Sequence, residues 1–184
     1  MAYEVVKSEN RYHGILLDVV VDTITLPKRS PNEPERTTRR EIVRPRKPAA
    51  AILPIDSDGK MILVRQYRHS TGGFELELPA GILENGEDPA EGAARELEEE
   101  IGKKAGKLTK MFGFYSSIGV CDEYVTIFLA ENLIDSVQNL DDDEFVTIEK
   151  YTPAEALELI ELAGIEDSKT IAAISYYMLT AQKG

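Results

Sequence analysis

The sequence predicts a mixed α+β domain that is preceded by a small antiparallel β extension. Strand-like segments rich in Val, Ile, Leu and Thr are interrupted by a few helical segments, without the regular alternation of a βαβ dinucleotide-binding fold. The chain has 184 residues, of which 42% are hydrophobic and 29% charged. That length and composition suit one globular domain with a hydrophobic core and a terminal extension.

Residues 1–47 are predicted to form the β extension, and residues 48–184 the main domain. Residues 13–26 are rich in β-branched side chains and indicate a strand, and residues 37–44 resume an extended pattern after a proline-rich turn. Pro45 follows directly and marks a boundary, because the residue before a proline is biased towards extended structure.

The main domain begins with a predicted β-hairpin, in which residues 49–56 and 61–67 flank a turn at Ser57–Gly59. Residues 74–81 alternate apolar and acidic side chains before a proline and a glycine, which predicts another strand. The elements expected after the first helix are strands at 108–115, 124–130 and 145–151, a helix that begins with the capping box Thr152 to Glu155, and a helix over 169–182.

Charge and cysteine content narrow the classes of function. The net charge of -12 disfavours nucleic-acid binding, which needs a basic face against the phosphates. No apolar run is long enough to span a bilayer, and the first ten residues have no apolar core typical of a secretory signal. Cys121 is the single cysteine and forms no internal disulfide, so we expect a cytoplasmic protein.

The segment from Asp88 to Gly102 predicts a helix with both ends specified. Asp88 suits the N-cap, Pro89 suits the first turn, and Gly102 suits a left-handed C-terminal cap. Apolar side chains recur on one face at helical spacing: Ala90, Ala93, Leu97 and Ile101.

A different face of this helix carries Glu96, Glu99 and Glu100. Their i, i+3 and i+4 spacing brings the carboxylates together, although like charges so placed repel by roughly 0.3 kcal/mol. A divalent cation removes that repulsion, and Mg²⁺ or Mn²⁺ prefers carboxylate oxygens and often shares its coordination with substrate phosphates. The alternative is a solvated acidic face, which is the usual reason for a run of charged residues.

The residues around the three glutamates resemble the Nudix box of the Nudix hydrolase family. Gly81, Glu87 and the run from Arg95 to Gly102 stand at the fixed spacing of that box. One position departs, since the box has an aliphatic residue after its last glycine where this chain has Lys103. Lys103 lies past the acidic residues, so we expect it to affect local packing more than chemistry.

The resemblance implies an α/β/α sandwich with a mixed sheet and metal-dependent cleavage of a diphosphate linkage. It implies that Arg95 and Glu87 brace the loop and the helix at the catalytic centre, with Arg95 orienting a carboxylate. Metal ions lower the pKa of the attacking water and neutralise the diphosphate. The implied ligands of the Mg²⁺ or Mn²⁺ ions are Glu96, Glu99, Glu100 and the backbone carbonyl of Ala80.

Segments outside the box resemble the ADP-ribose pyrophosphatase branch of the family. They are RREIVRP at 39–45, VRQYRHS at 64–70, ELPAG at 77–81 and DDDEF at 141–145. The resemblance implies that Arg68 contacts the substrate phosphates and that Arg39 or Arg40 reaches the site of a partner subunit.

A late-loop glutamate is the general base implied by this branch, and Glu144 stands at the matching position. Glu123 is a rival candidate, because it lies in the loop before a predicted strand. One departure bears on the substrate, since Ile118 stands where this branch commonly has a proline.

ADP-ribose, cleaved to AMP and ribose 5-phosphate, is therefore the first expected substrate. GDP-mannose or another nucleotide sugar is the alternative within the same reaction, because function depends on the site and not on the fold. A nucleotide-sensing module without catalysis is the alternative of a different class, and loss of box carboxylates would favour it. The N-terminal extension is too small to bury a core of its own and is expected to form a homodimer.

Overall fold

Two compact units make up the chain in the computed structural model, which describes residues 3–140 and 144–181. One unit contains the residues up to Pro48 together with Tyr115–Glu123, and the other contains Ala49–Phe114 and the residues from Tyr124 onward. The sequence did not indicate that Tyr115–Glu123 belongs with the N-terminal residues.

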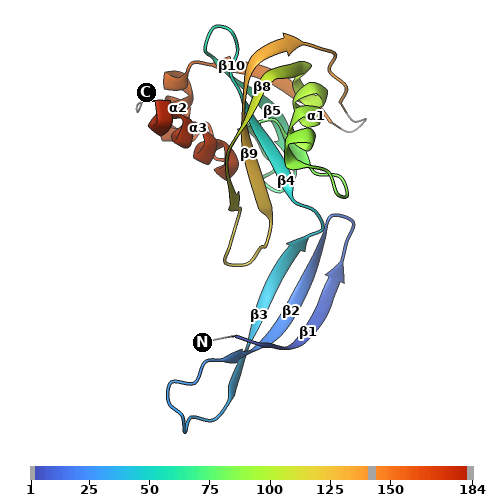
Figure 1. Cartoon of the computed structure of the whole chain (residues 1–184), viewed down its shortest axis with the longest axis vertical. Helices are drawn as coiled ribbons and strands as arrows, with labels where there is room; N and C mark the ends of the chain where they lie inside the picture. Colours follow the sequence, from blue (N-terminus) through green and yellow to red (C-terminus); the bar gives the residue numbers. More distant parts are fainter. Residues whose placement is uncertain (1–2, 141–143, 182–184) are drawn as a thin grey trace. The chain divides into compact units, whose positions relative to one another are not determined.

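The N-terminal unit is built on a three-stranded antiparallel sheet in the order β1-β2-β3, drawn in blue tones in Figure 1. Its strands are β1 (Val5–His13), β2 (Leu17–Leu26) and β3 (Arg36–Pro45). The strand expected over 13–26 begins only at Leu17, because the N–H of Gly14 donates to the carbonyl of Leu17 and closes a turn. Val5–His13 was not expected to be a strand.

The segment Tyr115–Glu123 lies along β3 within this unit. The N–H of Val43 donates to the carbonyl of Val120 at 2.7 Å, and the N–H of Asp122 donates back to the carbonyl of Val43 at 3.2 Å. These bonds provide partners for backbone groups that an edge strand otherwise leaves open.

The second unit contains two sheets. One has the order β7-β4-β9-β8, in which β4 pairs parallel with β9 and antiparallel with β7, so this sheet is mixed. The other has the order β10-β5-β6 and is antiparallel. The strands are β4 (Ala49–Pro54), β5 (Met61–Arg68), β6 (Gly73–Glu77), β7 (Ala80–Ile82), β8 (Lys103–Tyr115), β9 (Tyr124–Asp135) and β10 (Val146–Tyr151).

The predicted hairpin of β4 with β5 is wrong, although its turn is present. Gly59 has a φ of 76° in the turn, but β4 and β5 belong to different sheets and share only the bridge between Ile55 and Met61. The physical reason is that β4, buried from Ala50 onward, pairs along both edges, with β7 and with β9, so neither edge is open to β5.

Helices cover both sides of these sheets, as Figure 1 shows for α1 (Pro89–Ile101) on one side and for α2 (Pro153–Glu161) and α3 (Ser168–Ala181) on the other. Alternate residues of β4 face the two layers. Ala51 and Leu53 pack in the core beneath α2 and α3, whereas Ala50 and Ile52 pack in the core beneath α1. This arrangement is the expected α/β/α sandwich.

The ends of the helices follow the expected capping signals. The hydroxyl of Thr152 accepts from the N–H of Glu155 and the Glu155 carboxylate accepts from the N–H of Thr152, which forms the capping box of α2. None of the helices in the described part of the chain is long and apolar enough to cross a membrane.

Candidate active site

Helix α1 presents the acidic residues because its two ends are fixed locally. Asp88 Oδ1 accepts from the N–H of Ala90 at 2.8 Å, and Gly102 ends the helix in the left-handed region with a φ of 63°. Leu97 and Ile101 are buried in the core on the apolar face. Fixing this face inward sets the direction in which the carboxylates project.

Arg95 ties the loop before α1 to the helix. Its Nε donates to Glu87 Oε1 at 3.0 Å, its Nη2 donates to Glu87 Oε2 at 3.2 Å, and Nη2 also reaches the carbonyl of Ile82. Glu87 Oε2 accepts from the N–H of Glu84 at 2.7 Å as well. The fork of a guanidinium matches a carboxylate in this way, so loop and helix are held as one piece.

The same guanidinium joins two of the three box glutamates. Arg95 Nη1 donates to Glu96 Oε1 at 2.7 Å and to Glu99 Oε2 at 2.8 Å, so the two carboxylates converge on one cationic nitrogen. Gly81 makes room for this arrangement, because a Cβ on Gly81 would lie 1.9 Å from Glu96 Oε1.

Glu100 is the most deeply buried of the three, with 2% of its surface exposed. Its Oε2 accepts from the N–H of Ala80 at 3.0 Å. The structure therefore brings Ala80 to the glutamates through its N–H, while ligation by its carbonyl stays a prediction.

Burial and like charge dominate the electrostatics of this cluster. Burial raises the pKa of Glu100 to about 8, the charges of Glu96 and Glu144 add to the shift, and the Ala80 N–H opposes it. Burial also raises the pKa of Glu96, against the hydrogen bond from Arg95. Buried carboxylates with so little compensation favour a bound cation.

The donor set fits a hard divalent cation. Within residues 3–140 and 144–181 no three His, Cys, Asp or Glu side chains already stand in a metal-ligating arrangement. Glu96 and Glu99 instead share the guanidinium of Arg95, a cationic partner at the point where their oxygens converge. Carboxylate oxygens are the ligands that Mg²⁺ and Mn²⁺ prefer, and Glu96, Glu99 and Glu100 supply them from one helix face.

Arg68, the predicted phosphate contact, lies at the end of β5 and is bound to Glu77 of β6. Its Nε and Nη2 donate to the two carboxylate oxygens at 2.6 and 3.0 Å, which leaves Nη1 without a protein partner in the described part of the chain. Lys169 at the start of α3 also donates to Glu77, at 2.5 Å. Burial alone would raise the pKa of Glu77, but Arg68 and Lys169 outweigh it and hold that pKa below its usual value.

Glu144 and Glu123, the two candidates for the general base, occupy different units. Glu144 precedes β10 and is near enough for its charge to raise the pKa of both Glu96 and Glu100. Glu123 belongs to the N-terminal unit, where its carbonyl accepts from the N–H of Ser116. Of the DDDEF segment, residues 141–143 lie outside the described residues.

Arg39 and Arg40 lie on β3 in the N-terminal unit, where both side chains are exposed. Arg40 Nη1 donates to the hydroxyl of Thr38 at 3.1 Å and to the carbonyl of Arg39 at 2.9 Å. Their predicted role in a partner's site stays a prediction.

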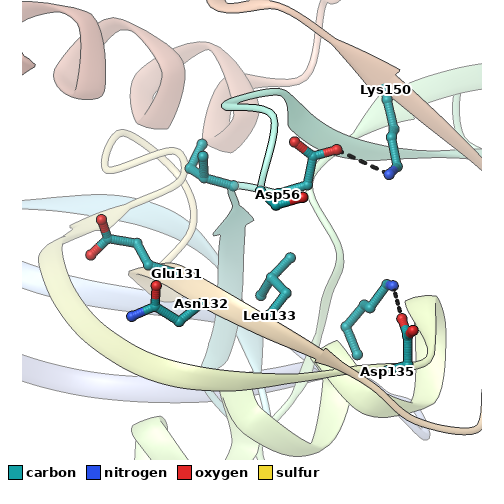
Figure 2. Close-up of a pocket in the computed structure, with 9 residues that line it drawn as sticks. Asp56, Glu131, Asn132, Leu133, Asp135 and Lys150 are labelled. Carbon is teal, nitrogen blue, oxygen red and sulfur yellow. Dashed lines mark hydrogen bonds and ion pairs between the residues drawn. The ribbon is translucent and has the colours of Figure 1, made fainter.

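A pocket of about 500 Å³ opens on the second unit, and Figure 2 shows the ion pair of Lys150 with Asp56 at its wall. Lys103, the residue that departs from the box, lines this pocket and pairs with Asp135. None of the predicted site residues lines it. The candidate site therefore rests on the carboxylates of α1 and not on this volume.

Sequence reasoning missed Glu77, Lys169 and the buried Gln66 of β5. An acidic residue in a strand, between Leu76 and Leu78 that face the opposite core, was an available signal for Glu77. Lys169 carried no such signal, because its partner is distant in the sequence.

Comparison with known proteins identifies the family. Residues 45–174 match the NUDIX domain, and the chain belongs to the Nudix hydrolase family. It is 40% identical to an ADP-ribose pyrophosphatase of Bacillus subtilis (strain 168) over 95% of this chain and 91% of that protein. It is 37% identical to a methanol dehydrogenase activator of Bacillus methanolicus, with the same shares covered.

A solved structure described as an ADP compounds hydrolase has the same fold. It aligns with a TM-score of 0.84, at 22% identity, over 100% of this chain and 96% of that one. This match confirms the expected fold class. The family match and the B. subtilis relative confirm the expected enzyme class, a Nudix hydrolase.

Proposed function

We propose that this Nudix hydrolase cleaves the diphosphate bond of ADP-ribose to give AMP and ribose 5-phosphate. The observation that carries the proposal is the burial of Glu96 and Glu100, at 9% and 2% exposure, on one face of α1 beside Arg95. A folded protein keeps two adjacent carboxylates buried at a considerable cost, which a metal-bound diphosphate substrate explains. The similarity to the B. subtilis ADP-ribose pyrophosphatase supports the choice of substrate.

Each group of site residues has a separate role in this proposal. Glu96, Glu99, Glu100 and the Ala80 carbonyl would hold Mg²⁺ or Mn²⁺, and a bound ion would supply neutralisation of the diphosphate and a lower pKa for the attacking water. Glu87 and Arg95 hold the loop against α1, and Arg95 orients the carboxylates of Glu96 and Glu99. Arg68 directs its free Nη1 to a phosphate oxygen while Glu77 holds its other nitrogens.

Glu144 takes the proton of the attacking water. Its charge reaches Glu96 and Glu100, so it is close to the carboxylates at which the reaction takes place. A carboxylate beside a metal-activated water is a suitable general base near neutral pH.

A homodimer completes the assembly in this proposal, with Arg39 or Arg40 of one subunit reaching the other subunit's site. The N-terminal sheet has few buried side chains, namely Val20, Val21 and Asp22 among its described residues. A three-stranded sheet with so small a core is stabilised by packing against a further surface.

The cytoplasm is the proposed compartment, because Cys121 is free, as is typical of a reducing environment. Nucleic acid is not a proposed partner, because the net charge of -12 disfavours a basic binding face. GDP-mannose remains the alternative substrate within the same reaction. The name of the B. methanolicus relative describes an effect on another enzyme and not a substrate, so it does not displace ADP-ribose.

The test incubates the purified protein and Mg²⁺ or Mn²⁺ with ADP-ribose, GDP-mannose, other nucleotide sugars, NADH and dinucleoside polyphosphates. Products are resolved by chromatography. Glu100→Gln is the test variant, and Glu98→Gln is its matched control, because Glu98 is on the same helix but pairs with Ser136 and Lys104 away from the cluster.

We expect AMP and ribose 5-phosphate from ADP-ribose with the wild type and with Glu98→Gln, and no product with Glu100→Gln or with a chelator. Faster turnover of another nucleotide sugar would keep the mechanism and replace the substrate. Metal binding by a folded protein that turns over none of these compounds would favour the sensing module instead.

A further inference from the structure

Gln66 is a buried polar residue in the middle of the antiparallel sheet of the second unit. It lies on β5, where it pairs with Val146 of β10 on one edge and with Glu75 of β6 on the other. Only 9% of its surface is exposed. Its side chain points to the same face as Arg68 two residues on, which is the side of the sheet that faces α1 because Val64 and Val146 pack there.

The amide oxygen of Gln66 is buried and has no hydrogen-bond partner in the described part of the chain. Leaving a buried acceptor unsatisfied destabilises the folded state, so such groups are rare in folded proteins. Either a hydrogen-bond donor outside the described residues satisfies the amide oxygen of Gln66, or Gln66 has a functional role.

The charged residues around Gln66 are those of the proposed catalytic centre. Arg68 is two residues further along β5, and Glu144 is two residues before Val146, the strand partner of Gln66. Because β10 runs antiparallel to β5, Arg68 and Glu144 both lie on the same side of the Gln66–Val146 pair. Gln66 is therefore two residues from the phosphate-binding residue, and its strand partner is two residues from the proposed general base.

Among the described residues, no donor hydrogen-bonds to the Gln66 amide oxygen. Glu75 and Glu144 carry carboxylates, Arg68 directs Nε and Nη2 to Glu77, and Nη1 of Arg68 is assigned to the substrate phosphate in the proposed function. An O–H of water or of the substrate would supply the donor.

We propose that Gln66 is a catalytic residue that holds the attacking water, its amide oxygen accepting one hydrogen of that water while Glu144 accepts the other. A water molecule has two hydrogens, and a base that binds only one leaves the oxygen lone pair free to turn away from phosphorus. A second, neutral acceptor fixes the orientation without competing for the proton. Orientation of an attacking water by a glutamine is known chemistry in phosphoryl transfer.

The step balances as a hydrolysis. The water oxygen forms a bond to one phosphorus while the bond from that phosphorus to the bridging oxygen breaks, and the electron pair leaves on the bridging oxygen. One water proton passes to Glu144, and the other stays on the new phosphate oxygen with its hydrogen bond to Gln66. This inference rests on the proposed function, since it needs a diphosphate substrate.

The test compares Gln66→Met with the wild type on whichever nucleotide sugar the wild type cleaves. Methionine keeps the length and volume of the side chain but removes the acceptor. We expect kcat to fall roughly 100-fold, the loss typical of a reactant held slightly out of place, with KM unchanged. The dissociation constant for a methylene-bridged, uncleavable analogue of that substrate should also be unchanged, because the variant loses a contact with the attacking water and no contact with the substrate.

Thermal unfolding without metal or substrate provides a readout that does not depend on activity. Removal of an unsatisfied buried acceptor should leave the melting temperature of Gln66→Met equal to or above that of the wild type. A folded variant with normal kcat, or one with unchanged kcat and weaker analogue binding, would overturn the proposal. A lower melting temperature would show that the oxygen has a structural partner and would overturn it as well.

The experiment distinguishes a failure of the proposed function from a failure of the role proposed for Gln66. A wild type that cleaves nothing removes both the proposed function and the role of Gln66. A wild type that cleaves a nucleotide sugar while Gln66→Met cleaves it at the same rate removes only the role of Gln66.

Discussion

At Glu77 a carboxylate that is 3% exposed is held by two cations from distant parts of the chain, Arg68 and Lys169. Burying a charge is expensive unless it is paired and hydrogen-bonded, and here both oxygens are engaged. The same pairing turns Arg68 so that Nη1 is left for a phosphate. If Arg68 binds the substrate as proposed, Glu77 positions it for that contact.

Glu77→Gln is expected to destabilise the protein, because it leaves Arg68 and Lys169 without their common counter-charge. Breaking a buried ion pair typically costs about 3 kcal/mol, and the partial exposure of Arg68 makes this an upper figure. Urea unfolding followed by circular dichroism measures it. Glu161→Gln, an exposed change on α2, is the control and should be neutral.

The pH dependence of stability should also change in this variant. The pKa of Glu77 is lowered from 4.5 in the folded protein, so its contribution to stability is complete above 4.5 and is lost as the pH falls through the lower folded value. We expect the wild type to lose unfolding free energy between about pH 5 and pH 3, and Glu77→Gln to lose less over that range. Equal slopes in urea titrations across this range would contradict the assignment.

At the scale of single elements, Gly81 of strand β7 contacts the side chain of Glu96 on helix α1. The side chain of Glu96 fills the space that a Cβ on Gly81 would occupy. We expect Gly81→Ala to displace the Glu96 carboxylate and to lower metal-dependent turnover by roughly 100-fold. Gly119→Ala is the control, since a Cβ there meets nothing within 4 Å. Normal kinetics for Gly81→Ala would mean that Glu96 is free to move.

The capping box of α2 gives an element whose stability is separable from the site. Thr152→Ala removes the hydroxyl that accepts from the N–H of Glu155, and such a change costs about 1 kcal/mol. Denaturant unfolding should show this loss, with kcat and KM unchanged. Thr180→Ala near the end of α3, whose hydroxyl bonds only to its own helix, is the comparison and should cost less.

Elements that are specified by residues close in the sequence were predictable, and the pairing of strands with one another was not. Asp88, Pro89 and Gly102 specify α1 by contacts within a few residues, so its bounds and its carboxylate face were both expected. The partner of β4 depends on which strands lie along its edges, and a turn at Gly59 carries no information about that. The hairpin prediction was wrong for this reason.

The same distinction between local and long-range contacts applies to the residues of the candidate site. Glu87, Arg95 and the box glutamates lie on one continuous segment. Helical spacing predicted the shared face of the glutamates, and the resemblance to the Nudix box implied the roles of Glu87 and Arg95. The contact of Glu77 with Lys169 and the pairing of Gln66 with Val146 depend on helix docking and strand order, which local patterns do not encode.

For the whole molecule, the expected assembly is a dimer that needs the N-terminal sheet. Light scattering of the full chain at micromolar concentration should give twice the chain mass of 20.5 kDa. A Val5→Asp, Val6→Asp double variant, which charges exposed apolar positions of β1, should shift the mass towards the monomer. Leu162→Asp, an exposed apolar position after α2, should stay dimeric, and a monomeric wild type would end the proposal.

The contacts of Arg95 and Glu87 with the loop before α1 also bear on which changes this chain tolerates over evolutionary time. Arg95 reaches Glu87 and the Ile82 carbonyl at once, and Glu87 in turn fixes the N–H of Glu84. An inserted or deleted residue between Gly81 and Glu87 would break all of these contacts together, whereas the exposed side chains of Glu84 and Asn85 can vary. Length in this loop should therefore be invariant among functional descendants, while its composition drifts.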